Sequence, residues 1–346
     1  MELIVSERVA PEDWDTRVCE TGGSLFHSTA WARFLEAERP GAVPLFMSFV
    51  EADGTAVACA LGVFSRSPRA ALRPFTGRLN VDAAPVVPVG RPRAFHDVLG
   101  VLECHARALG ATELFVGSYA SPLGSEALES RRFTLTRRLE FELSLDRPES
   151  EVWEEMESKR RWSVKRATQH GVTIEELPPQ AGLLALRRLQ AASSERIERR
   201  GGPRIGRRGA PSDDPVRVLL DSGVGRIMGA RVGSAVVSAA LFTLFNGRVY
   251  QHLAGHDETA LKTQAPTLLY WETIKRYRME GARCFNLGGC KLEAIDAGSP
   301  EHGVYDFKKA FGGSVLACTS GSKSLRPTAR RVAGMLVRMS RWMSFA

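Results

Sequence analysis

The chain has 346 residues, of which 44% are hydrophobic and 25% are charged, and its formal net charge at pH 7 is +8. This length favours two domains, and this composition excludes disordered and fibrous classes and is typical of a soluble globular protein. No apolar run is long enough to span a bilayer. The first residues, Met1–Glu7, lack a basic segment followed by an apolar one, so we predict no signal peptide.

The cysteines indicate a reducing compartment. The six cysteines are scattered and include no Cys-x-x-Cys pair, so we predict reduced thiols in a cytoplasmic protein. His252 and His256 lie four residues apart in a predicted strand-to-loop stretch, and we predict no metal site there. The positive net charge favours a polyanionic partner, although an arginine-rich composition alone decides nothing.

The first part of the chain alternates short strands and helices. Asp53-Gly54 is typical of a hairpin turn, and Gly110 is typical of the end of a helix. The predicted elements are a strand at Glu2–Val5, a helix at Thr29–Glu38, strands at Pro44–Val50 and Thr55–Phe64, a basic loop at Ser65–Leu79, a helix at Arg93–Leu109, and strands at Thr112–Val116 and Arg132–Leu145.

The second part of the chain shows a similar succession of predicted strands and helices. Asp146 and Glu149 fit a capping box that opens a helix running to Gly171, and Asn246-Gly247 predicts a hairpin turn. The other predicted elements are strands at Val172–Glu176, Gly225–Val232, Ala235–Phe245, Arg248–Ala254 and Cys284–Leu287, and helices at Pro179–Arg199, Pro215–Asp221 and Pro266–Glu280. Helices mixed with antiparallel hairpins predict an α+β fold with mixed sheets.

The most informative motif of the sequence combines a glycine pair with a lysine, Lys308. The predicted strand ending in Gly288-Gly289 precedes a turn in which Phe307 and Phe311, four residues apart, share one helical face. Packing of that face fixes where Lys308 points, and a fixed ammonium beside a glycine-rich strand end can stabilise a developing oxyanion. The alternative is a surface lysine on an amphipathic turn. Asp306 and Glu301 are the nearby candidates for a general base.

These motifs resemble the FemABX family of aminoacyl-tRNA-dependent amide ligases. The resemblance rests on Asn286-Leu287-Gly288-Gly289 and on the stretch Gly303–Gly312, which is similar to the family's Gly-(Leu/Val)-Tyr-x-Phe-Lys-x-x-Phe-Gly. It implies two tandem acyltransferase-like (GNAT) domains, at 1–145 and 146–325, followed by a helix at 326–346. It also implies direct aminolysis without a cofactor, with Lys308 and Asp306 as catalytic residues.

Substrate contacts are predicted from the same resemblance and from charge. Arg161 best matches a family arginine that is involved in acceptor binding. The predicted substrate-binding residues are Arg160, Arg161, Lys165, Tyr250, Tyr305 and Asn286. A second arginine-rich segment has few acidic residues within it and suits phosphate oxygens, so the resemblance implies tRNA contact there. Its members are Arg196, Arg199, Arg200, Arg204, Arg207 and Arg208. The alternative for these charges is a solvated surface, and for Tyr250 it is ordinary core packing.

Two departures from the sequence patterns of related enzymes narrow the range of predicted substrates. As we align it, Leu35 replaces a lysine that holds phosphate in many members binding nucleotide-linked precursors, which disfavours a UDP-linked acceptor. The stretch Leu261–Pro266 lacks the glycines that a GNAT loop uses to hold coenzyme A pyrophosphate, which disfavours acyl-CoA. We predict transfer of an amino acid from aminoacyl-tRNA to an amine of a peptide acceptor, either a peptidoglycan precursor or a peptide natural product.

Two alternatives stay open. One is an acyl-CoA-dependent N-acyltransferase, and the other is a non-catalytic protein that binds RNA or a membrane surface. The second is motivated in part by Arg330–Phe345, where apolar residues recur at helical spacing among arginines. Such a basic amphipathic helix makes peripheral contact with an anionic membrane or packs on its own protein.

Overall fold

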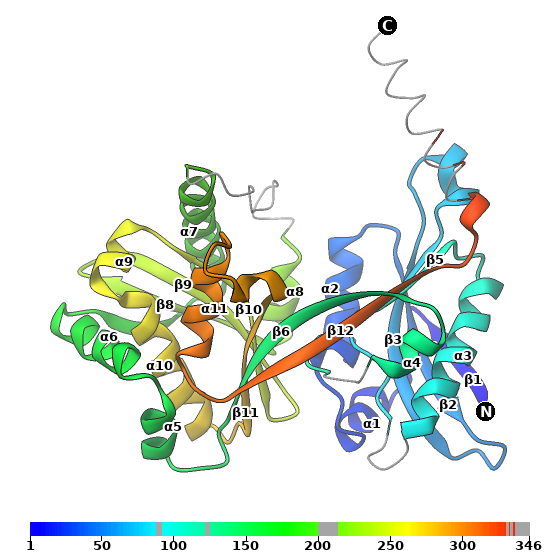
Figure 1. Cartoon of the computed structure of the whole chain (residues 1–346), viewed down its shortest axis with the longest axis horizontal. Helices are drawn as coiled ribbons and strands as arrows, with labels where there is room; N and C mark the ends of the chain where they lie inside the picture. The colour runs from blue at the N-terminus through cyan, green and yellow to red at the C-terminus, as the bar shows by residue number, and fades with distance from the viewer. Residues whose placement is uncertain (88–91, 122–124, 200–213, 330–331, 333–334, 336–346) are drawn as a thin grey trace, which may run out of the picture. The chain divides into compact units, whose positions relative to one another are not determined.

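The computed structural model describes residues 1–87, 92–121, 125–199, 214–329, 332 and 335. The chain divides into two compact units (Figure 1). Unit 1 is Met1–Arg137 with the residues from Cys318 onward, and unit 2 is Arg138–Ala317. The predicted domains at 1–145 and 146–325 stay a prediction, because compactness does not test independent folding. The predicted helix at 326–346 lies largely outside the described residues.

Unit 1 is built on a mixed sheet with the strand order β1-β2-β3-β4-β5-β12. Its strands are β1 (Glu2–Glu7), β2 (Val43–Val50), β3 (Ala56–Ser65), β4 (Arg78–Val81), β5 (Glu113–Val116) and the second part of β12 (Ser314–Ser324). Its helices are α1 (Trp14–Glu20), α2 (Thr29–Glu38), α3 (Pro92–Ala108) and α4 (Glu126–Ser130). Phe95, Leu99 and Leu102 of α3 pack with the apolar residues of β2 and β4, which forms the core of this unit.

Unit 2 is built on the strand order β6-β11-β10-β9-β8-β7. Its strands are β6 (Thr134–Ser144, from Arg138 on), β7 (Thr173–Leu177), β8 (Gly225–Val232), β9 (Ala235–Phe245), β10 (Arg248–His256) and β11 (Cys284–Lys291). Its helices are α5 (Glu149–Glu155), α6 (Ser158–Gln169), α7 (Pro179–Arg199), α8 (Val216–Asp221), α9 (Glu258–Thr263), α10 (Ala265–Met279) and α11 (His302–Lys309).

Helices cover both faces of the unit 2 sheet. Gly182 of α7 lies against Ile227, whereas the residues of α10 share a core with Met228, which points to the opposite face of the same strand. Figure 1 shows α7 on one face and α10 with α6 on the other. The predicted α+β architecture of mixed sheets flanked by helices is therefore confirmed.

The two units share one topology. In each, antiparallel strands lead to one parallel pair, β4 with β5 in unit 1 and β10 with β11 in unit 2. The strand that follows each parallel pair is antiparallel, β12 beside β5 and β6 beside β11. The sequence shows no matching repeat, so the relationship becomes visible only through the order of the strands.

Two details of the sequence-based prediction are wrong. The single helix expected to begin after Asp146 and to end near Gly171 is broken into α5 and α6, because Met156 has an extended ψ of 135°. The predicted capping box is absent at this helix start, where Pro148 is the N-cap and provides no side-chain cap. In addition, no strand was predicted where β12 lies.

Within the described part of the chain, no helix is long and apolar enough to cross a membrane.

Candidate active site in unit 2

The parallel pairing of β10 and β11 covers only the start of both strands. The register runs from Arg248 opposite Cys284 to Tyr250 opposite Asn286 and then ends. Each strand is irregular just beyond this point, β10 between Gln251 and Leu253 against β9, and β11 between Asn286 and Gly289 against β6. A bulge bends its strand and re-aims the side chains around it. These two irregularities define the centre of the candidate site.

Glycine is required at the bend of β11. Gly288 has a φ of +71°, and a Cβ there would lie 2.8 Å from the Gln251 carbonyl oxygen and 3.3 Å from the Lys308 Nζ. A Cβ on Gly289 would lie 2.5 Å from the Leu139 carbonyl oxygen. Positive φ and close approach of backbone are both conditions that glycine alone meets without strain. The predicted close approach and positive φ at the Gly-Gly pair are confirmed, but the predicted strand end is wrong, because β11 continues through the pair to Lys291.

Lys308 reaches this bend from α11. It is buried, with 8% of its surface exposed, and its Nζ donates a hydrogen bond to the Gly289 carbonyl oxygen at 3.0 Å. Lys308 forms no salt bridge with a carboxylate of the described residues. Burial lowers the pKa of Lys308 to about 8, an effect that Arg138 reinforces and that Cys290 and Glu140 oppose. The alternative of a surface lysine is therefore wrong.

The turn that carries Lys308 is fixed by aromatic packing, as its spacing predicted. Phe307 and Phe311 pack edge to face with ring centroids 5.3 Å apart, and both lie near Tyr270 of α10. The Arg160 guanidinium lies over the Phe307 ring at 4.6 Å. These contacts hold α11 against α6 and α10 and so determine where the lysine enters the site.

A buried carboxylate, which the sequence analysis missed, lies at the centre of the same site. Glu140 of β6 is 0% exposed, and its strand position is opposite Gly289. It accepts hydrogen bonds from the Tyr250 hydroxyl at 2.9 Å and from the Asn286 amide at 2.8 Å. Arg138 forms a 3.1 Å ion pair with it. Glu140 lies between Leu139 and Phe141 in an alternating strand, a pattern that predicts a solvent-facing side chain. The sequence alone does not show that the face of the strand on which Glu140 lies is covered.

Two of the predicted substrate-binding residues belong to this cluster. Tyr250 and Asn286 both bind Glu140, and burial raises the pKa of the Tyr250 phenol well above its ordinary value. Tyr250 is therefore more than a packing residue, because its hydroxyl belongs to a buried polar network. Whether either residue contacts substrate stays a prediction.

Asp306 and Tyr305 point elsewhere on α11. The Asp306 side chain is 60% exposed and lies 3.2 Å from the His302 imidazole, two residues before Lys308 and so on another side of the helix. The Tyr305 ring packs edge to face on Phe141 at 5.8 Å and also lies below the Lys309 ammonium. The structure thus does not bring Asp306 together with the Lys308 ammonium, and its catalytic role stays a prediction.

The predicted arginines of α6 have partners within the protein. Arg160 donates to the Thr267 hydroxyl at 3.3 Å as well as stacking on Phe307, and burial lowers its pKa. Arg161 donates to the carbonyl oxygens of Trp153 and Glu154, which ties α6 to the end of α5. Lys165 is exposed. These contacts give Arg160 and Arg161 structural roles, and their contacts with an acceptor stay predictions.

The arginine-rich segment is only partly described. Arg196 binds the His256 carbonyl at 3.1 Å and its imidazole at 2.9 Å, and Arg199 pairs with Glu258 at 3.3 Å. Both contacts anchor the end of α7 to the segment around β10 and α9. Arg200, Arg204, Arg207 and Arg208 lie outside the described residues, so their predicted contact with tRNA stays a prediction.

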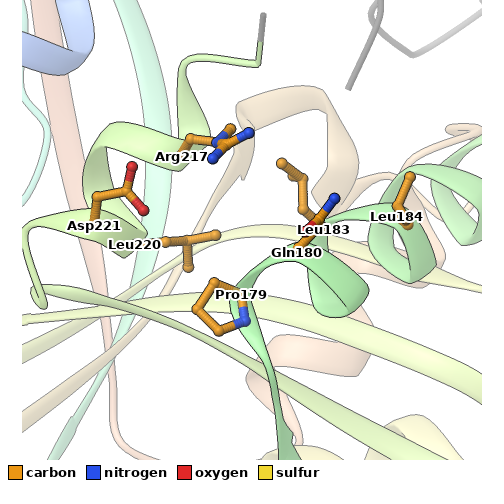
Figure 2. A pocket seen from close by; sticks show the side chains of 7 residues that line it. All are labelled: Pro179, Gln180, Leu183, Leu184, Arg217, Leu220 and Asp221. Carbon is orange, nitrogen blue, oxygen red and sulfur yellow. The ribbon is translucent and has the colours of Figure 1, made fainter. Parts of the chain in front are cut away.

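A separate pocket of about 170 Å³ lies between the start of α7 and α8. Figure 2 shows Leu183 and Leu220 beside its apolar wall and Arg217 at its margin. Its lining includes none of the residues around Lys308. The candidate active site is therefore defined by buried polar groups and a strand irregularity, and not by this pocket.

Comparisons with known proteins bear on the fold. Residues 158–309 match the family model described as an acetyltransferase (GNAT) domain, whereas no curated protein matches the sequence. The solved structure of FemX shares 15% identity and a TM-score of 0.71, with 92% of this chain and 97% of that chain covered. This chain therefore has a GNAT-like fold.

Two further solved structures resemble the whole chain. One is the C-terminal domain of a putative lysylphosphatidylglycerol synthetase from Agrobacterium fabrum, with 13% identity, a TM-score of 0.51, and 93% of this chain and 96% of that chain covered. The other is a tandem GNAT protein from the clavulanic acid biosynthesis pathway, with 12% identity, a TM-score of 0.51, and 94% and 100% covered. At these identities each likeness shows a shared fold, and the predicted tandem GNAT-like architecture is confirmed.

Proposed function

We propose that this protein transfers an aminoacyl group from an aminoacyl-tRNA to an amine of a peptide-containing acceptor. The observation that carries the proposal is the Lys308 ammonium, buried at the bend of β11 and bound there to the Gly289 carbonyl, without a carboxylate partner among the described residues. Burying a cation without a counter-charge costs stability. A site that bears this cost is suited to a substrate or transition state that supplies negative charge.

Direct aminolysis creates negative charge at one atom. The acceptor amine attacks the ester carbonyl carbon of the aminoacyl-tRNA, and the carbonyl oxygen becomes an oxyanion. The bond from that carbon to the ribose oxygen then breaks, and the proton lost by the amine ends on the released tRNA hydroxyl. The ester is already activated, so the protein has to position both substrates and stabilise the oxyanion. Lys308 would supply that stabilisation.

The structural relatives support aminoacyl transfer in general. FemX gives the higher TM-score of the comparisons above, and another relative is named as a putative synthetase of a lysyl-bearing lipid. A lysyl group is an aminoacyl group. The acceptor is proposed from the resemblance of the motifs, as a peptidoglycan precursor or a peptide natural product. Leu35, which aligns with the phosphate-holding lysine, is 3% exposed and packs in the core of unit 1, so this position offers no positive charge to a phosphate.

An acyl-CoA-dependent N-acyltransferase is the second candidate, because residues 158–309 match an acetyltransferase model. The start of α10 disfavours it. In GNAT enzymes this region uses free backbone N–H groups to hold pyrophosphate, but here the N–H groups of Thr267 and Leu268 donate to the Gln264 carbonyl, and Pro266 has none. Gln264 itself occupies a left-handed conformation, with φ of 59°, where a glycine is usual.

The test is a transfer assay with the purified protein. Total tRNA charged with radiolabelled amino acids is mixed with UDP-linked precursor, lipid-linked precursor or short peptides, with and without prior RNase treatment. We expect RNase-sensitive label in one acceptor. Lys308→Ala should lower the rate by about 100-fold or more, the usual effect of removing an oxyanion-stabilising donor. Lys309→Ala is the matched control, because Lys309 is the exposed neighbour on the same helix.

Each outcome separates the candidates. Turnover of acetyl-CoA without any transfer from charged tRNA would favour the N-acyltransferase. Salt-dependent RNA or vesicle binding with no product would favour the non-catalytic alternative. Label transfer that is equal in Lys308→Ala and Lys309→Ala would contradict the role of Lys308, even if the reaction itself were established.

A further inference from the structure

Glu140 connects three neighbouring strands of unit 2 through one buried carboxylate. Its Oε1 accepts from the Tyr250 hydroxyl of β10 and pairs with Arg138 of β6, and its Oε2 accepts from the Asn286 amide of β11. Truncating one partner of such a fully buried charged network is costly, because the remaining groups lose their hydrogen bonds. The carboxylate therefore fixes both side chains relative to β6.

The contact with Asn286 also fixes the backbone of β11. The Asn286 Nδ2 donates to Glu140, so its Oδ1 points the other way, where it accepts the N–H of Gly288 at 2.7 Å. Gly288 is the residue with positive φ at the irregularity of the strand. The Glu140 carboxylate thus determines the orientation of the Asn286 amide, and the amide holds the bend.

The bend in turn places the group that holds Lys308. The residue after Gly288 is Gly289, and its carbonyl oxygen accepts the Lys308 ammonium at 3.0 Å. The titratable and charged groups that influence Lys308 are Cys290 of β11 and both Arg138 and Glu140 of β6. Glu140 therefore acts on the lysine in two ways, through the backbone that it fixes and through its negative charge.

Building on the proposed function, we infer that Glu140 is a positioning residue for the transfer reaction, holding the bend of β11 so that the Gly289 carbonyl places the Lys308 ammonium where the oxyanion forms. Glu140 is fully buried, so it does not itself touch the substrate. Its removal should misplace Lys308, and small displacements of a catalytic group lower the rate by up to about 100-fold.

The first variant is Glu140→Gln. The glutamine keeps the size of the side chain but removes the charge that pairs with Arg138. Its amide can accept from Asn286 only while its nitrogen faces the Tyr250 hydroxyl, which must then accept instead of donating. We expect kcat to fall by about 10- to 100-fold with less than a threefold change in the KM of either substrate. The matched control is Glu142→Gln, two residues along the same strand, where the carboxylate pairs with Arg248 at 2.8 Å. It should keep kcat within twofold.

A paired exchange separates positioning from general damage to the fold. In Glu140→Gln with Asn286→Asp, the new amide donates to the new carboxylate, whose other oxygen still accepts the Gly288 N–H. All the hydrogen bonds that hold the bend are kept, and only the contact between residues 140 and 286 has its donor and acceptor exchanged. We expect the double variant to recover kcat to within about fivefold of the parent. A kcat of Glu140→Gln within twofold of the parent, or a folded double variant no faster than the single one, would overturn the inference.

A readout without catalysis distinguishes this inference from the proposed function. Competitive acetylation of Lys308 with acetic anhydride across pH, followed by mass spectrometry, reports the pKa of that lysine. Losing the negative charge of Glu140 should lower this pKa, whereas Glu142→Gln should leave it unchanged. If the parent transfers no aminoacyl group, the proposed function fails, and an unchanged Lys308 titration in Glu140→Gln would overturn the placement of Lys308 by Glu140 as well.

Discussion

Each unit contains a largely buried lysine beside its core, and the two lysines differ in what they bind. In unit 1, Lys323 of β12 donates to the Glu103 carboxylate at 2.6 Å and to the Arg131 carbonyl oxygen at 2.7 Å. In unit 2, Lys308 donates to the Gly289 carbonyl at 3.0 Å and has no salt bridge to a described carboxylate. A paired ammonium contributes to the fold, whereas an unpaired one lowers stability and is available for chemistry.

The parallel strand pairs of the two units differ in the same direction. In unit 1 the backbone contacts continue past the end of β4 and β5, since the N–H of Gly117 donates to the Val81 carbonyl at 2.6 Å and the N–H of Tyr119 to the Asp82 carbonyl at 3.3 Å. In unit 2 the register ends at Tyr250 and Asn286, and a side chain satisfies the Gly288 N–H. One topology is thus closed in unit 1 and interrupted in unit 2, where the candidate site lies.

The largest expected effect on stability is that of Lys323→Met, which tests whether the paired lysine of unit 1 stabilises the fold. The Glu103 carboxylate, with 10% of its side chain exposed, would lose its ammonium partner and keep only Arg131 at 3.6 Å. We expect the free energy of unfolding to fall by about 3 kcal/mol, the lower end of the cost of removing one partner of a buried ion pair, because Arg131 remains. Chemical denaturation measures this change. The double variant with Glu103→Leu should recover most of it, and an unchanged midpoint in the single variant would contradict the structural role of Lys323.

Lys308→Met should have the opposite sign. The folded-state pKa of Lys308 is about 8, below its ordinary value of 10.5, so its buried charge costs stability fully below pH 8. The difference corresponds to about 3 kcal/mol, and loss of the hydrogen bond to Gly289 returns about 1 kcal/mol. At pH 7 the variant should therefore be about 2 kcal/mol more stable than the parent while it loses activity.

The pH dependence checks the sign of that prediction. Between pH 8 and 10.5 the unfolded parent binds more protons than the folded parent, so the parent gains stability as the pH rises and its deficit against Lys308→Met shrinks. Thermal unfolding at pH 7 and at pH 10 measures the two differences. A variant that is less stable than the parent at pH 7 would show that Lys308 is a stabilising residue like Lys323.

Of the fold, the order and type of the elements could be predicted and their assembly could not. Pro179–Arg199 and Gly225–Val232 were predicted with their observed limits, because apolar periodicity and turn residues are local properties. β12 was missed, because Ser314–Ser324 is rich in small polar residues and becomes a strand only beside β5. The break at Met156 was missed because no proline or glycine marks it.

Of the site, the lysine could be predicted and its supporting shell could not. Lys308 was predicted from the resemblance of Gly303–Gly312 to the family motif, together with the spacing of Phe307 and Phe311, which fixes its direction on the helix. Glu140 lies 168 residues earlier in the chain, as its number shows, and pairs with Gly289 only in the folded sheet. Long-range pairing of this kind leaves no local pattern, so a buried glutamate has the same sequence signature as an exposed one.

The smallest expected effect sharpens the comparison at acidic pH. Burial lowers the pKa of His252 in unit 2 to about 3, and it also lowers the pKa of His27 in unit 1. Below about pH 6.5, each of these histidines binds fewer protons in the folded protein than in the unfolded protein, so stability falls as the pH falls. His252→Gln should remove about 1 kcal/mol of the loss between pH 6.5 and 5.5, measured by urea unfolding at both pH values. An unchanged difference between the two pH values would show that this imidazole titrates normally.

The strand β12 also bears on how the protein is made. Unit 1 contains a contact between Ser118 and Ser320, which are 202 residues apart, and one between Glu103 and Lys323, which are 220 residues apart. At synthesis rates of about 5–20 residues per second, β5 emerges from the ribosome roughly ten seconds or more before its partner strand. Its edge is unpaired for that interval, while the residues of unit 2 emerge as one continuous stretch. The unit whose residues are made first is therefore the last to be completed.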